Sequence, residues 1–93
     1  MDIEQIKQKV KPILRRHRVK KASLFGSYVR GEQTKLSDID LLVRMPANSS
    51  LFDLANLKIE LEEILKKKVD LLTFKALHPL VRDRILSETV KVL

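Results

Sequence analysis

Three aspartates are the residues of this 93-residue chain whose spacing best fits a chemical role. Asp38 and Asp40 are two positions apart in an apolar stretch, so in an extended strand both side chains point to one face, about 6 to 7 Å apart. Like charges this close are costly unless a cation compensates them, and carboxylates together with substrate phosphates are usual ligands of Mg²⁺. Asp70 opens another apolar stretch and can supply a third carboxylate from a neighbouring strand. The spacing predicts a divalent metal site of the kind that aligns attacking and leaving oxygens in phosphoryl or nucleotidyl transfer.

The same pattern also has a plainer interpretation. Two aspartates at alternate positions can be the water-facing side of an amphipathic strand, and Asp70 can be an exposed residue at the start of its strand. Two observations weigh against this interpretation. Aspartate is a poor strand former, and Leu42 shares the face of Asp38 and Asp40, so that face is not simply open to water.

Gly26 and Ser27 predict a phosphate-binding turn that follows a short strand. Glycine lets the backbone approach a ligand closely, and serine adds a hydroxyl donor. A helical turn after the pair would direct its free N–H groups toward an anion. A Gly-Ser pair by itself is an ordinary end of a strand, so this prediction depends on the aspartates.

The apolar pattern predicts an α/β (α+β) domain that occupies residues 1–93 as a single unit. Pro12 is expected to kink or split the first helix, because proline removes a backbone donor and clashes with the preceding turn. The expected elements are a helix from Asp2, strands over 21–25, 37–45 and 69–74, a short helical segment through Arg30, a helix over 51–65 and a last helix from His78 and Pro79. Residues expected to face the core include Leu51, Leu54, Leu57, Leu61, Ile64 and Leu65 in the long helix and Leu80, Val81, Ile85 and Leu86 in the last helix.

Composition narrows the class of protein. Apolar residues make up 44% of the chain and charged residues 33%, which is typical of a folded domain. The chain has no cysteine, which excludes a thiolate nucleophile and a zinc–thiolate site and fits a reducing compartment. No apolar run approaches the roughly 18 residues that span a bilayer. We expect a cytoplasmic protein without a membrane segment.

The net charge of +7 is concentrated near the N-terminus, where residues 1–21 contain eight Lys or Arg and only two acids. The run from Arg15 to Lys21 could attract phosphate, nucleic acid or an acidic partner by long-range electrostatics. Its plainer interpretation is a solvated basic end of a helix, which the helix dipole favours. Both interpretations stay open at this point.

Four other polar residues are expected to be structural. Ser37 has no nearby histidine to activate it as a nucleophile, so it is expected to form a hydrogen bond at the start of its strand. His17 and His78 have no second ligand at metal-binding spacing. Tyr28 is expected to be a partly buried residue of ordinary type.

The stretch G-S-Y-V-R-G-E-Q-T-K-L-S-D-I-D-L-L-V, from Gly26 to Val43, resembles the signature of the DNA polymerase β-type nucleotidyltransferase superfamily. In that signature Asp-x-Asp follows Gly-Ser after ten residues, as it does here. The later V-D-L around Asp70 and the closing P-L-V-R-D-R-I-L-S-E-T-V are similar to the stand-alone minimal nucleotidyltransferases of prokaryotes. The resemblance implies the polymerase β-like fold, a small mixed β-sheet of three to four strands flanked by helices.

The resemblance also implies a function and roles for single residues. It implies that Mg²⁺, as two ions and with Mn²⁺ as an alternative, holds ATP as the substrate. It further implies that the chain transfers AMP to a tyrosine of a HEPN-type toxin, with which it forms a heteromeric complex as antitoxin. Two alternatives remain, an antitoxin that acts by binding alone and a nucleic-acid-binding module that uses residues 15–21. The implied nucleotide-binding residues are Gly26, Ser27, Arg30 and Ser37, and the implied catalytic and metal-binding residues are Asp38, Asp40 and Asp70.

Overall fold

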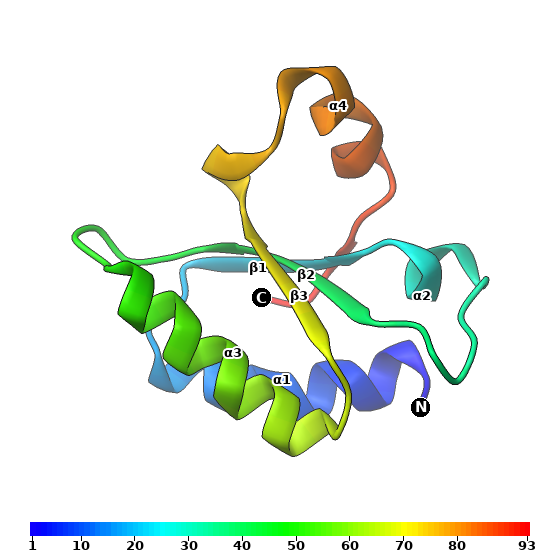
Figure 1. The fold of residues 1–93 in the computed structure, drawn as a ribbon, viewed down its shortest axis with the longest axis horizontal. Coiled ribbons are helices and arrows are strands. Elements are labelled where there is room, and N and C mark those ends of the chain that lie inside the picture. Colours follow the sequence, from blue (N-terminus) through cyan, green and yellow to red (C-terminus); the bar gives the residue numbers. More distant parts are fainter.

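The computed structural model describes all 93 residues and contains one four-stranded mixed sheet flanked by helices (Figure 1). The strand order is β3-β2-β1-β4, in which β1 is antiparallel to β2 and β4, and β2 is parallel to β3. The predicted fold class is confirmed. The elements are α1 (Ile3–Arg16), β1 (Lys21–Phe25), α2 (Ser27–Arg30), β2 (Ile39–Arg44), α3 (Leu51–Leu65), β3 (Val69–Thr73), the 3₁₀ turn η1 (Phe74–Ala76), α4 (Pro79–Ser87) and β4 (Val90–Lys91).

The first helix is a single element, so of the two predicted effects of Pro12, a kink or a split, the split is wrong. Asp2 and Gln5 cap its start reciprocally, with each side chain accepting a hydrogen bond from the backbone N–H of the other residue, at 2.8 and 2.9 Å. Pro12 is exposed, and the donor it lacks would have bonded the carbonyl of exposed Gln8, which water can satisfy. Buried side chains on either side of the proline hold α1 against the core.

Helices α1 and α3 lie together on one side of the sheet, and α4 stands on the other side (Figure 1). The face of the sheet toward α1 and α3 carries the core. Leu51 and Ile64 were expected in this core, but their side chains are 84% and 42% exposed. Leu51 is the first residue of α3, and Ile64 lies near its end beside buried Leu65. The buried side chains include Ile6, Val10 and Leu14 of α1, Leu24, Ile39, Leu41 and Val43 of the sheet, and Leu57, Leu61 and Leu65 of α3.

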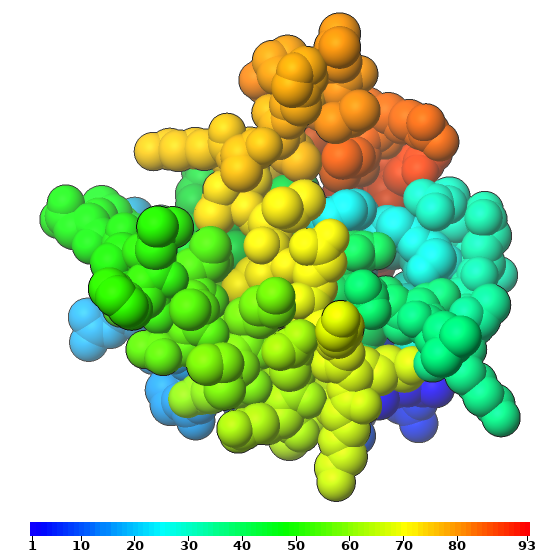
Figure 2. All heavy atoms as spheres, in the orientation of Figure 1, coloured from blue at the N-terminus to red at the C-terminus, as the bar shows by residue number.

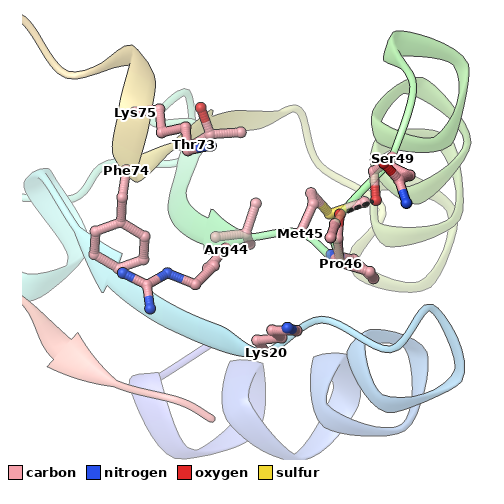
Figure 3. A pocket seen from close by; sticks show the side chains of 11 residues that line it. Lys20, Arg44, Met45, Pro46, Ser49, Thr73, Phe74 and Lys75 are labelled. Carbon is pink, nitrogen blue, oxygen red and sulfur yellow. Dashed lines mark hydrogen bonds between the residues drawn. The ribbon is translucent and has the colours of Figure 1, made fainter.

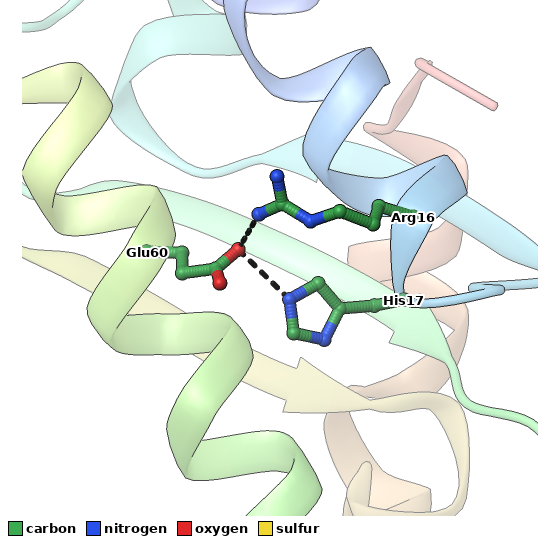
Figure 4. A network of polar contacts seen from close by, with 3 residues as sticks. All are labelled: Arg16, His17 and Glu60. Carbon is green, nitrogen blue, oxygen red and sulfur yellow. Dashed lines mark hydrogen bonds and ion pairs between the residues drawn. The ribbon is translucent and has the colours of Figure 1, made fainter.

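A polar network joins the end of α1 to the middle of α3 (Figure 4). His17 Nε2 lies 2.9 Å from Glu60 Oε2, and Arg16 forms an ion pair with the same carboxylate. The hydrogen bond with His17, and then Arg16, lowers the pKa of Glu60. The structural role predicted for His17 is confirmed, and one arginine of the basic run is held by the fold itself.

The last helix does not bury the residues that its sequence suggested. His78 Nδ1 accepts a hydrogen bond from the Leu80 backbone N–H at 3.1 Å, which caps α4 and confirms a structural role for His78. Leu80, Val81 and Leu86 are 87%, 42% and 39% exposed, so the prediction that they contact the core was wrong. In the space-filling view α4, in orange, projects from the body of the molecule (Figure 2). Leu77, just before the helix, is buried in their place.

The chain ends in a short strand that the sequence pattern did not locate. β4 contains only Val90 and Lys91, too few residues to show an alternation, and it pairs with β1 at Ser23 and Leu24. Val92, which follows it, is buried and donates its backbone N–H to the Ala22 carbonyl at 2.9 Å. No helix of the chain has both the length and the apolar character needed to cross a membrane.

Candidate active site

The beginnings of β2 and β3 bring the predicted carboxylates together. In the parallel β2–β3 pair, Asp40 lies directly opposite Asp70, so their side chains share one face of the sheet. The backbone N–H of Ile39 donates to the carbonyl of Lys68 at 3.0 Å and fixes this register. Asp38 precedes β2 and is exposed, so it lies before the strand and not in it as predicted.

The strand begins two residues later than predicted because a turn occupies the residues before it. The Ser37 hydroxyl accepts a hydrogen bond from the backbone N–H of Thr34 at 2.8 Å, and the Ser37 N–H donates to the Thr34 carbonyl at 3.1 Å. The predicted hydrogen-bonding role of Ser37 is confirmed. Its role toward a nucleotide stays a prediction.

Gly26 lies against Asp40 at the end of β1. Its φ of 81° and ψ of −151° belong to a region that only glycine occupies at low cost, and a Cβ at this position would overlap the Asp40 carboxylate. The Gly26 carbonyl accepts the N–H groups of Val29 and Arg30, both at 3.1 Å. The amides of Ser27 and Tyr28, which open α2, therefore have no acceptor within the helix. Tyr28 is buried, as an ordinary structural tyrosine would be.

The environment of Asp40 is strongly unfavourable for a negative charge. Burial, followed by the charges of Asp70 and Asp38, raises the pKa of Asp40 from 3.8 to about 6, while Arg30 acts in the opposite direction. An arrangement that disfavours a carboxylate until a cation arrives is expected at a metal or substrate site. Asp38 and Asp70 thus act on the charge of Asp40, and Gly26 lies against its carboxylate.

The donor set fits a metal ion that arrives with its substrate. No three acidic or histidine side chains are arranged to hold an ion by themselves. Mg²⁺ is usually bound through one or two carboxylates, waters and substrate phosphates, and not in a cage made of protein ligands alone. Half-buried Asp40 and exposed Asp38 and Asp70 fit that mode of binding.

A cavity of about 240 Å³ opens beside the Gly26 turn and extends under α4. Arg30 lines it and forms ion pairs with Glu32 at 3.3 Å and with Glu88 of the chain end at 3.8 Å. Arg84 and Glu88 line the cavity too, and neither is among the site residues predicted from the sequence. Their spacing of four residues, which puts both on one face of a helix, is the signal that could have found them.

We expect Asp40 to make the free energy of unfolding depend on pH. Between pH 3.8 and about 6 the folded chain binds more protons than the unfolded chain, so stability decreases as the pH rises through this window. Asp40→Asn should flatten this slope and raise the free energy of unfolding at pH 8 by about 1 to 2 kcal/mol, after allowance for solvent screening. Urea unfolding in chelator from pH 4 to 8 measures both effects. Glu63→Gln, at an exposed site, is the control; equal slopes for wild type and Asp40→Asn would contradict the role of Asp40.

The Gly-Ser turn beside paired aspartates on this sheet places the chain in a known class of proteins. The family model described as "Nucleotidyltransferase domain" matches residues 3–92, and the chain belongs to this family. It is similar to a candidate protein adenylyltransferase of Methanocaldococcus jannaschii, with 57% identity over 93 residues that cover 100% of both chains. It is also similar to the protein adenylyltransferase MntA of Thermococcus cleftensis, with 38% identity over 98% of this chain and 93% of the relative.

Solved structures have the same fold. A candidate minimal nucleotidyltransferase matches with a TM-score of 0.84 and 35% identity over 97% of this chain and 95% of its own. A crystal structure of a toxin–antitoxin with AMP-PNP matches with a TM-score of 0.81 and 24% identity over 94% of this chain and 72% of its own. The predicted membership among minimal nucleotidyltransferases is confirmed.

Proposed function

We propose that this chain transfers AMP from ATP to a hydroxyl group of a partner protein, with Asp38, Asp40 and Asp70 as the carboxylates that hold the metal ions. The observation that carries the proposal is the meeting of Asp40 with Asp70 and with Gly26 at one end of the sheet. The adenylyltransferase names of the relatives support AMP as the transferred group.

The proposed role of each site residue follows from its position. The Gly26–Ser27 turn and its free amides bind the triphosphate, and Arg30 adds a positive charge at the neighbouring cavity. Asp38 and Asp40 would hold divalent ions on the triphosphate, and Asp70 on the adjacent strand would orient the ion nearest the acceptor. Bound Mg²⁺ would supply charge neutralisation for the phosphates.

The reaction is a substitution at the α-phosphorus of ATP. The acceptor hydroxyl oxygen forms a bond to this phosphorus, the bond to the bridging oxygen of the β-phosphate breaks, and pyrophosphate leaves with that oxygen. The proton of the acceptor hydroxyl passes to solvent water. Asp40 must be deprotonated for this reaction, and a bound cation favours its deprotonated form.

We propose a HEPN-type toxin as the acceptor and a tyrosine of it as the modified residue. A similar solved structure is a toxin–antitoxin with AMP-PNP, which supports a toxin partner and an adenine nucleotide. The apolar residues left exposed on α4, which include Leu80 and Val81, support a protein that works in a complex. An antitoxin that acts by binding alone remains the second candidate, because this surface would serve either mode.

We expect Asp70→Asn to reduce transfer far more than ATP binding. Asparagine keeps the size and one oxygen ligand but loses the charge that positions the ion near the acceptor, so the rate of transfer should decrease by about 10²-fold or more. Calorimetry with ATP and Mg²⁺ should give an affinity within about threefold of wild type. The mass of the co-purified partner after incubation with ATP and Mg²⁺ measures transfer; a normal mass increase with Asp70→Asn would exclude this role.

A further inference from the structure

A second and larger cavity lies at the end of β2, opposite to the end that carries the aspartates. It has a volume of about 490 Å³ and is lined by Lys20, by the end of β2 with the loop that follows it, and by residues 73–75 at the start of η1 (Figure 3). Three of its lining residues are cationic and none is acidic. We refer to the pocket formed by Lys20, Arg44, Phe74 and Lys75, together with Asn48 and Ser49, as the basic pocket.

The basic pocket shares a strand with the catalytic centre. Arg44 follows Asp40 by four residues on β2, so their side chains lie on the same face of the sheet, about 13 Å apart along the strand. Buried Leu42 separates them. This face of the sheet therefore carries negative charge at the end with Asp40 and positive charge at the end with Arg44.

The fold holds like charges together at this pocket. Lys21 of β1 lies directly opposite Arg44 of β2, an arrangement that destabilises an antiparallel pair. Lys21 Nζ and Arg44 Cζ both lie over the ring of Phe74, 5.2 and 6.0 Å from its centroid. In Figure 3 the Arg44 side chain extends to this ring. The ring thus holds two cations that would otherwise repel each other.

None of these cations is neutralised by the protein. The ion pairs of the chain involve Lys7, Arg16, His17 and Arg30, and no carboxylate lies within 4.0 Å of Lys20, Lys21, Arg44 or Lys75. The Phe74 ring offsets the repulsion between Lys21 and Arg44, and all four cations are exposed and free of carboxylate partners. They are therefore available to an anionic ligand.

We infer that the basic pocket binds the phosphate groups of a single-stranded nucleic acid. Its volume is in the range of small-ligand sites and admits a nucleotide unit. The backbone N–H of Lys20 donates to the Arg44 carbonyl at 2.9 Å, which joins the basic run of residues 15–21 to the pocket. The positive surface therefore extends beyond the size of one phosphate group. A nucleic-acid strand, which carries one negative charge per nucleotide, matches it.

The basic run of residues 15–21 does not form this contact alone. Arg16 of that run is paired with Glu60. Arg44, Phe74 and Lys75 come from other parts of the chain and form the concave part of the surface. The site is separate from the catalytic centre and requires neither a metal ion nor ATP.

The test measures binding of a labelled ten-residue oligouridylate to the whole chain by fluorescence anisotropy, in chelator and without ATP. Arg44→Gln with Lys75→Gln should weaken binding by about tenfold at 100 mM salt and should lower the slope of log Kd against log salt by about 1.4. The matched control is Lys9→Gln with Lys58→Gln, which removes the same charge at exposed positions of α1 and α3. This control should weaken binding by less than about threefold.

Three results would overturn the inference. Equal weakening by the pocket pair and the control pair would mean attraction by net charge alone. Displacement of the oligonucleotide by uridine monophosphate at equal phosphate concentration would identify a free nucleotide as the ligand. Binding of a polyglutamate peptide that requires Arg44 and Lys75, with oligonucleotide binding unaffected by them, would identify an acidic protein partner. Asp38→Asn with Asp40→Asn should leave oligonucleotide binding unchanged, so this test and the test of transfer can fail independently.

Discussion

The double variant Asp38→Asn with Asp40→Asn is expected to lose nucleotidyl transfer and most of its metal-dependent affinity for ATP. Both carboxylates are assigned to the ions on the triphosphate, and Asp40 is the residue whose charge the site already disfavours in the absence of a cation. Removing both charges takes away the ligands that bring the ions to the phosphates. We expect a decrease of at least about 10³-fold in the rate of transfer. Calorimetry and the mass of the partner measure the two losses.

The matched control is Glu4→Gln with Glu63→Gln, which removes two acidic charges from exposed positions outside the site. It should retain transfer. The aspartate double variant should still co-purify with the toxin, because the exposed apolar residues of α4 are unchanged. If cells that express the toxin are fully protected by this double variant, the protein acts by binding alone and not as an enzyme.

The sequence predicted the elements where local chemistry alone determines them. Asp2 with Gln5 and Ser50 with Asp53 are reciprocal caps, and each starts a helix at the predicted residue. These caps depend on neighbours within a few positions, so a single sequence contains them. The alternation of residues predicted on which face of its strand each aspartate lies, whereas the opposition of Asp40 and Asp70 depends on the β2–β3 register.

What the sequence could not show depends on contacts between distant residues. The apolar residues Leu80, Val81, Ile85 and Leu86 suggested a buried face, but whether anything covers α4 depends on how far it stands from the sheet. The meeting of Lys21 with Arg44 requires the β1–β2 register. The metal-binding role of the three aspartates depends on bound ions and not on the chain alone. This role stays a prediction.

The second variant with a large expected effect is Gly26→Ala. The backbone of Gly26, with φ 81° and ψ −151°, lies where an alanine costs roughly 1 to 3 kcal/mol. The added Cβ would also overlap the Asp40 carboxylate, so the aspartate must move away from the phosphate turn. We expect the affinity for ATP in the presence of Mg²⁺ to decrease by at least about tenfold, together with a lower melting temperature.

Gly31 provides a control for the backbone part of this effect. It also has a positive φ, 72°, but a Cβ there would meet no atom within 4 Å. Gly31→Ala should therefore cost only about 1 kcal/mol of stability and leave ATP binding within about threefold of wild type. If both alanine variants reduced ATP binding equally, the contact between Gly26 and Asp40 would have no part in forming the site.

A double-mutant cycle separates the overlap with Asp40 from backbone strain. In an Asp40→Ala background the carboxylate that Gly26→Ala would displace is absent, so the stability cost of Gly26→Ala should be smaller than in wild type. The backbone cost remains in both backgrounds and cancels in the cycle. Urea unfolding of the four proteins measures the coupling free energy, which we expect to exceed about 1 kcal/mol. A coupling near zero would mean that Asp40 avoids the new methyl group without loss, and that the turn and the aspartate are not one unit.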